Sequence, residues 1–226
     1  MKTLDIRGLY QQLYNQMGPQ RWWPAERWWP AERWMETIVG SILIQNASAK
    51  TVDPVIEKVE RETNFDPATL MAMSQEELEQ LIFEAGLYRS KAKYLRASLQ
   101  FFAEYDFDLT ELQKLDTPTL RKRIRAVSGI GNETADVWLV YIFGRAQFIA
   151  DSYSRRLMNF LGGPEKLTYE KVQKVVMMNS DFTPDEAREF HALIDEFGKL
   201  YLRNREQFLT SWLKDANLSD KLLEQF

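Results

Sequence analysis

The sequence predicts an all-α protein. Apolar residues recur at intervals of three and four along most of the 226 residues, as they do on the buried face of a helix. Residues that start helices and glycines that end them separate these segments. Sustained alternation of apolar and polar residues, the pattern of a half-buried strand, is confined to a weak signal over residues 146–150. These three observations favour packed helices.

The first half of the chain contains clear start and stop signals. An amphipathic helix is expected over residues 4–17, ending at Gly18, and an apolar helix over residues 34–44, ending in polar residues from Gln45 to Ser48. Later helices are expected to start at Asp53-Pro54, at Asp66-Pro67 and at the capping box Ser74-Gln-Glu-Glu77. A further helix is expected over residues 88–105.

The second half continues in the same way. A helix that starts near Asp116-Thr117-Pro118 is expected to break at Ser128, and a second one to open at Asn132 and run to Gly144. Asp151 has the position of an N-cap for a helix over residues 152–161. Further helices are expected over residues 169–178, 184–204 and 211–226.

Composition excludes several classes of protein. A content of 45% hydrophobic residues is enough for one large domain or two small ones. Because the chain has no cysteine, disulfides and cysteine-ligated zinc or iron–sulfur sites are excluded. No segment has the apolar length of a membrane span and the N-terminus lacks a signal-peptide core, so we expect a cytoplasmic protein without a membrane partner.

The charge is unevenly distributed. The chain carries a net charge of −4, but residues 114–156 contain eight basic and four acidic side chains, so this segment is +4 and the remainder is −8. A local basic face, including Arg123 and Arg125, can bind phosphates with an affinity that falls with salt. A charge run alone is more often a solvated helical face.

Four tryptophans lie in a tandem repeat near the N-terminus. The sequence Arg-Trp-Trp-Pro-Ala-Glu occupies residues 21–26 and again 27–32. Two copies are too few for a solenoid, and we interpret them as a local duplication within a loop. The tryptophans either pack over the core or form the aromatic wall of a ligand pocket, and the repeat alone favours packing.

The rest of the chain is organised around residues 120–157. Gly129 and Gly131 flank Ile130 between two expected helices, which allows backbone N–H groups at the start of the second helix to bind a phosphate. A Gly-Ile-Gly sequence alone is a weak signal, but here basic residues precede it and Asp151 follows at a distance of twenty residues. Asp151 alone is more simply interpreted as a helix cap.

These motifs identify a resemblance. Residues 128–136 (SGIGNETAD), 143–145 (FGR) and 149–157 (IADSYSRRL) resemble the helix-hairpin-helix DNA glycosylases of the endonuclease III superfamily, over about residues 4–210. The resemblance implies a two-lobed all-α fold. One lobe would comprise residues 35–150 with the hairpin, the other residues 1–34 and 151–226, and the active site would lie in the cleft between them.

The resemblance also implies roles for single residues. Gly129, Ile130 and Gly131 would bind the DNA backbone, Gln45 would fill the space left by a flipped nucleotide, and Asp151 would be the catalytic carboxylate. Bifunctional members have a lysine two residues after the second hairpin glycine, where this chain has Glu133. A carboxylate cannot form a Schiff base, so we expect hydrolysis of the base without strand cleavage.

Other residues point to one branch of this superfamily. Residues 191–199 match the stretch that precedes the cluster cysteines of many relatives, but Leu202 stands where the first of these cysteines would be. The resemblance therefore implies no iron–sulfur cluster, while a monovalent cation under the hairpin carbonyls stays an open alternative. The bacterial 3-methyladenine glycosylases without a cluster share a Trp-Trp-Pro motif, here Trp28-Trp29-Pro30, ahead of a helix that ends in Gln-Asn, here Gln45-Asn46.

This branch implies a pocket for a cationic base. Trp28, Trp29 and Pro30 would form its wall, because an aromatic face attracts a methylated purine, and Lys199 would line it. Ala49 departs from the branch, which places an aromatic residue there, so the stacking partner comes from elsewhere or the base differs.

We therefore expect a monomeric, monofunctional DNA glycosylase that removes an alkylated purine such as 3-methyladenine from double-stranded DNA in the bacterial nucleoid. One alternative is a glycosylase for mismatched, deaminated or oxidised bases. A second is a non-catalytic helix-hairpin-helix module that binds DNA.

Overall fold

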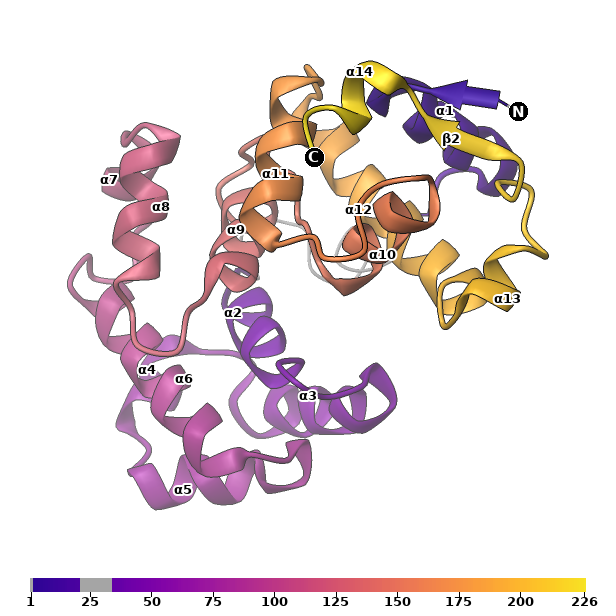
Figure 1. Ribbon diagram of the computed structural model, residues 1–226. Coiled ribbons are helices and arrows are strands. Elements are labelled where there is room, and N and C mark those ends of the chain that lie inside the picture. Colours follow the sequence, from indigo (N-terminus) through magenta and orange to yellow (C-terminus); the bar gives the residue numbers. More distant parts are fainter. Residues whose placement is uncertain (1, 21–33) are drawn as a thin grey trace. The chain divides into compact units, whose positions relative to one another are not determined.

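The computed structural model describes residues 2–20 and 34–226, and over this part the chain is largely helical (Figure 1). It divides into two units, described separately. The terminal unit comprises the described residues 2–20 and 144–226, and the hairpin unit comprises residues 34–143. Phe148 and Ala150 are buried in the core of the terminal unit, so the boundary expected at residue 150 differs from this division by several residues.

The hairpin unit is built around α2, Trp34–Leu43, whose residues from Met35 onward are all buried. Helices α3, α6 and α9 pack against it. In this core the indole Nε1 of Trp138 donates to Ser41 Oγ at 2.8 Å, which joins α9 to α2. The other helices of the unit are α3 (Ala49–Thr63), α4 (Pro67–Ala72), α5 (Gln75–Leu81), η2 (Phe83–Ala85), α6 (Tyr88–Ala103), α7 (Thr110–Gln113), α8 (Thr117–Arg125) and α9 (Asn132–Tyr141).

The terminal unit is built around α12, Pro184–Tyr201, which packs against α1 and α10. Phe190, Leu193 and Phe197 of α12 are fully buried in its core. The other elements of the unit are β1 (Lys2–Leu4), α1 (Ile6–Met17), α10 (Ser152–Phe160), α11 (Tyr169–Met178), α13 (Arg205–Phe208), β2 (Ala216–Leu218) and α14 (Asp220–Leu223).

A short parallel sheet joins the two ends of the described chain. Strand β1 pairs with β2, and Lys2 lies opposite Ala216 and Leu4 opposite Leu218 (Figure 1). The helix expected over residues 211–226 is therefore wrong, because only α14 is helical there. The weak alternation over residues 146–150 does not form a strand, since that segment has no regular secondary structure. Strands of three residues are too short to give a period, and their partners are remote in sequence.

Local signals set most helix boundaries. Both bonds of the predicted capping box are present at α5, where Glu77 N donates to Ser74 Oγ and Ser74 N donates to the Glu77 carboxylate. Helix α3 is an exception, since it begins at Ala49, four residues before the expected start at Asp53, and contains Pro54. Pro54 is the sixth residue of α3, where its missing N–H removes one hydrogen bond, and the helix continues through it.

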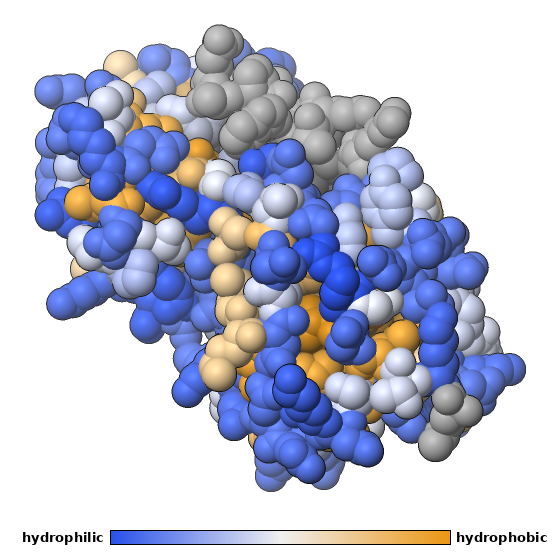
Figure 2. Space-filling model, turned by 90° about the horizontal axis from the view of Figure 1, so that it is seen from above, coloured by the Kyte–Doolittle hydropathy of each residue, from blue (hydrophilic) through white to orange (hydrophobic). Residues whose placement is uncertain are grey.

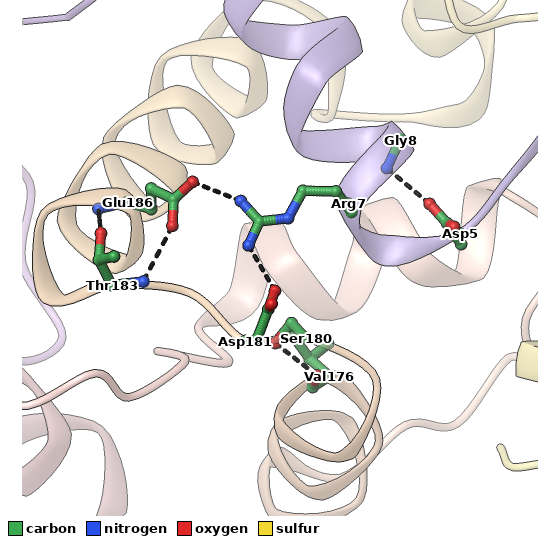
Figure 3. Close-up of polar contacts among 8 residues, drawn as sticks. All are labelled: Asp5, Arg7, Gly8, Val176, Ser180, Asp181, Thr183 and Glu186. Atoms are coloured by element: carbon green, nitrogen blue, oxygen red, sulfur yellow. Dashed lines mark hydrogen bonds and ion pairs between the residues drawn. The ribbon is translucent and has the colours of Figure 1, made fainter.

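An ion-pair cluster links α1 to the first turn of α12 and the segment before it (Figure 3). Arg7 donates to Asp181 at 2.6 Å and also to Glu186, which at the same time forms a capping box with Thr183. The hydrogen bond from Arg7 lowers the pKa of Asp181, and the backbone bond from Thr183 followed by Arg7 lowers the pKa of Glu186. Protonation of these carboxylates in acid would weaken the cluster.

Polar side chains cover most of the face shown in Figure 2, with hydrophobic side chains visible between them. Among the helices of residues 2–20 and 34–226, none combines the length and apolar character that a membrane span requires. Leu87 is the most exposed leucine among the described residues, at 62%.

Candidate functional site

The predicted hairpin lies between α8 and α9. Helix α8 ends at Arg125, the Ile130 amide donates to the Val127 carbonyl at 3.1 Å, and α9 begins at Asn132. The cap of α9 is Gly131 rather than Asn132, and glycine has no side chain that could bond to the first amides of this helix. These amides point out of the start of a helix, where its dipole favours an anion.

The two hairpin glycines differ in backbone conformation and in the space around them. Gly129 has a φ of 83°, and a Cβ there would lie 2.1 Å from the ring of Tyr94 on α6. Gly131 has an ordinary φ of −82°, and a Cβ there would meet no atom within 4 Å. The fold therefore requires the first glycine but not the second, and Gly131 keeps open the space in front of α9.

The remaining predicted hairpin residue is Ile130. It is only 5% exposed and belongs to the core, so its side chain anchors the hairpin and only its backbone is placed to meet a ligand. Glu133, at the position of the lysine in bifunctional relatives, is exposed in the first turn of α9.

The basic residues of α8 divide into two groups. Arg121 donates from Nε and from a terminal nitrogen to both oxygens of the buried Asp136, at 2.7 and 2.8 Å, which ties α8 to α9. The predicted phosphate ligands Arg123 and Arg125 are exposed, and Arg123 also donates to the Tyr105 hydroxyl at 2.7 Å. Structural and available positive charges therefore lie on the same helix.

Gln45 contacts the hairpin directly. It follows the end of α2, is half-buried, and its Nε2 donates to the Gly129 carbonyl at 3.2 Å and to Thr134 Oγ1 at 3.0 Å. The structure therefore brings Gln45, Gly129 and the start of α9 together within the hairpin unit.

A buried lysine, whose role sequence reasoning missed, holds the segments next to Gln45 together. Lys91 is 2% exposed, and its Nζ donates to the carbonyls of Leu43 and Ala85 at 2.7 and 2.8 Å. Burial lowers the pKa of Lys91. Because one ammonium group binds the ends of both α2 and η2, the turn that carries Leu87 lies beside the segment that carries Gln45.

Leu87 was also missed. It combines 62% exposure with a left-handed φ of 48°, an uncommon conformation for a leucine. No sequence pattern shows that a leucine in such a turn is exposed, although the glycine before Leu87 indicates the turn itself.

Asp151 lies in the terminal unit, at the start of α10. Its Oδ1 accepts the Ser154 amide at 2.7 Å, which confirms the predicted N-cap. Its Oδ2 forms no hydrogen bond with the described residues. Ser154 Oγ donates to the Ile149 carbonyl at 3.1 Å, and Arg155 donates to the Ala150 carbonyl at 2.7 Å. These contacts hold the backbone before Asp151 and leave one carboxylate oxygen available.

Lys199 lies on α12, which packs closely against α10. A Cβ at Gly198 would lie 2.4 Å from the ring of Tyr153, so the two helices meet at this glycine. Lys199 Nζ contacts Asp195 at 2.7 Å and Glu196 at 2.6 Å. Burial acts to lower the pKa of Lys199, but these two carboxylates outweigh it and the net shift is upward. Lys199 is therefore a cation.

A basic groove of about 610 Å³ lies along α10 and the segment after it. Its charged lining residues are Arg155, Arg156, Lys166, Arg203 and Glu165. Sequence reasoning missed this groove because its lining combines two segments that are about forty residues apart. Leu202, at the position of the first cluster cysteine, is fully buried, and its carbonyl accepts a hydrogen bond from Arg156. Trp28, Trp29 and Pro30 lie outside the described residues.

The chain matches the family model described as HhH-GPD superfamily base excision DNA repair protein over residues 39–179, more than half of its length. The chain belongs to this superfamily. The matched segment contains both the hairpin and Asp151. The predicted family is thereby confirmed, and this protein is a DNA glycosylase of the HhH-GPD base excision repair superfamily.

Two relatives extend the match in sequence. A Methanocaldococcus jannaschii protein that carries the provisional name of a DNA repair glycosylase is 33% identical over 203 residues, which cover 88% of this chain and 90% of that protein. An endonuclease III of Sulfolobus acidocaldarius is 26% identical over 174 residues, which cover 75% of this chain and 74% of that protein.

Solved structures match the fold of this HhH-GPD protein. A Helicobacter pylori 3-methyladenine DNA glycosylase bound to 1,N6-ethenoadenine has a TM-score of 0.72 and 21% identity, and covers 87% of this chain and 98% of its own. A trapped endonuclease III–DNA covalent intermediate has a TM-score of 0.71 and 19% identity, with 90% of each chain covered. The predicted all-α, endonuclease III-like helix-hairpin-helix fold is confirmed.

Proposed function

We propose that this glycosylase is monofunctional and hydrolyses the N-glycosidic bond of an alkylated purine, such as 3-methyladenine, flipped out of double-stranded DNA. The observation that carries the proposal is the available oxygen of Asp151, held at the start of α10 by the bond of the other oxygen to the Ser154 amide. Loss of the base builds positive charge on the sugar, and a fixed carboxylate stabilises this charge and orients the attacking water.

The hairpin unit supplies the DNA-binding part of the proposal. The open space in front of Gly131 and the amides at the start of α9 suit a backbone phosphate, and Arg123 and Arg125 add positive charge on α8. Gln45 would occupy the space of the flipped nucleotide. Leu87 follows η2, whose last carbonyl Lys91 ties to the last carbonyl of α2, and it would act as an apolar wedge between bases.

The absence of lyase chemistry rests on Glu133. The first turn of α9 carries a carboxylate where bifunctional relatives carry the amine that forms a Schiff base. We therefore expect borohydride to trap no covalent complex between the protein and DNA that contains a damaged base. A trapped complex with the wild-type protein would refute this part of the proposal.

The choice of base rests on sequence and on a relative. The motif Trp28-Trp29-Pro30 suits a cationic base, and a 3-methyladenine glycosylase shares the fold. A cationic purine already leaves readily and needs no general acid. Ala49, exposed at the start of α3, has no aromatic ring that could stack on a base. The assay should therefore include neutral bases as well.

Base release from duplexes that carry single alkylated, deaminated or oxidised bases tests the proposal. Release of 3-methyladenine is the expected result, and release of neutral bases alone would contradict the cationic pocket. Binding without release of any base would favour the non-catalytic module. We also propose that the protein binds no iron–sulfur cluster and is a monomer. Iron analysis tests the first statement, and sedimentation in solution tests the second.

A further inference from the structure

The side-chain amide of Gln45 is bonded twice to the hairpin. Nε2 carries two hydrogens, and it has two acceptors, the Gly129 carbonyl at 3.2 Å and Thr134 Oγ1 at 3.0 Å. A backbone carbonyl can only accept, so the nitrogen rather than the oxygen of the amide faces Gly129. The amide orientation is therefore fixed by chemistry.

This orientation determines what Gln45 can offer to another molecule. Both amide hydrogens are used within the hairpin unit, whereas Oε1 forms no hydrogen bond with the described residues. A glutamine held in this way presents an acceptor only. Thr134 is 7% exposed and lies in the first turn of α9, next to the amides proposed to bind phosphate, so its hydroxyl is held in place.

We propose that Thr134 is a positioning residue that, with the Gly129 carbonyl, fixes the Gln45 amide so that Oε1 faces the base left unpaired in the opposite strand. The inference rests on the proposed function, because it assumes that Gln45 enters the duplex. Fixing one rotamer before binding lowers the entropy cost of ordering the side chain, and it selects partner bases that present an N–H donor.

Thymine gives the sharpest probe. Its pairing edge has one donor, N3–H, and N3-methylthymine lacks this donor. Duplexes with a tetrahydrofuran abasic analogue opposite either base measure binding without chemistry. We expect the wild-type protein to prefer thymine roughly 3- to 10-fold, as for one hydrogen bond. The Gln45→Ala variant lacks the amide, so its binding to the two duplexes measures the effect of the N3-methyl group of the base alone.

The variants at residue 134 separate positioning from folding. Thr134→Val should lose the preference for thymine, Thr134→Ser should keep it because the hydroxyl remains, and Thr134→Val in the Gln45→Ala background should have no further effect. All variants should unfold at the wild-type temperature. If Thr134→Val proves unstable, Thr134→Ala provides the same comparison with Thr134→Ser.

Two results would overturn the inference. One is a thymine preference in Thr134→Val equal to that of the wild type. The other is no preference in the wild-type protein together with weaker binding by Gln45→Ala. The base-release assay is independent of this test: a wild-type protein that prefers thymine but releases no base would refute the proposed glycosylase activity and leave the inference standing.

Discussion

The hairpin glycines allow one chemical change to be made at two positions with opposite expected results. Replacing Gly129 by alanine places a methyl group at a φ of 83° and 2.1 Å from the Tyr94 ring. The left-handed conformation costs about 1–2 kcal/mol for alanine, and the overlap adds about 1–3 kcal/mol. We expect a loss of roughly 2–5 kcal/mol in the free energy of unfolding, or about 4–20 °C in Tm.

Replacing Gly131 by alanine should leave stability almost unchanged. The φ of −82° suits alanine, and the methyl group meets no atom within 4 Å. Alanine is a poorer helix cap than glycine but restricts the unfolded chain, so the two effects offset each other to within about 1 kcal/mol. The methyl group would, however, occupy the space in front of α9, where the proposed phosphate binds.

The DNA affinity of Gly131→Ala is therefore the informative measurement. Loss of one charge-assisted hydrogen bond costs about 1.5–3 kcal/mol, which corresponds to roughly 10- to 150-fold weaker binding. Fluorescence anisotropy with a duplex at fixed salt measures it, and thermal unfolding of the same samples checks the fold. A Gly131→Ala protein that binds DNA as tightly as the wild type would refute the phosphate site.

Three further predictions concern the proposed catalytic carboxylate and the charged contacts. Asp151→Asn should lower base release roughly 100-fold or more while duplex binding survives, whereas Asp215→Asn, an equal charge change at an exposed position of the same unit, should have no effect. Undiminished release in Asp151→Asn would refute the catalytic role. Arg121→Met should cost about 2–4 kcal/mol in urea unfolding, because it leaves the buried Asp136 without its bidentate partner; an unchanged midpoint would contradict this. Arg7 lowers the pKa of Asp181, and it adds to the larger effect of the Thr183 amide in lowering the pKa of Glu186. The contribution of these carboxylates is therefore present above their ordinary values near 3.8 and 4.5 and is lost as pH falls through the lowered values. Arg7→Met should therefore flatten the loss of stability in acid, and an unchanged acid transition would contradict the cluster's role.

Most helices could be predicted because their signals are local. The capping box at Ser74 and the N-cap at Asp151 are present as expected, and the helix predicted over residues 169–178 has the predicted bounds. The β1–β2 pair could not be predicted, because Lys2 and Ala216 meet only in the folded chain. Local patterns determine single helices, whereas pairing across the chain depends on packing.

The contacts of the candidate site were less predictable than its residues. The resemblance singled out Gln45, but its bond to Gly129 joins residues 84 positions apart. Lys91 lies on the helix expected over residues 88–105, yet its ammonium group binds two buried carbonyls. A pattern gives the face of a helix on which a long side chain starts, but it does not give where the charged end lies.

Asp151 illustrates how geometry makes two interpretations of one residue compatible. The sequence allows a structural cap or a catalytic carboxylate, and a cap alone is the simpler interpretation. A carboxylate has two oxygens, and here Oδ1 accepts the Ser154 amide while Oδ2 forms no hydrogen bond with the described residues. The two roles are therefore compatible, and the cap fixes the direction in which the second oxygen points. Since asparagine caps a helix about as well as aspartate, Asp151→Asn removes the negative charge and keeps the cap. A stable, DNA-binding but inactive Asp151→Asn protein would thus separate the two roles within one side chain.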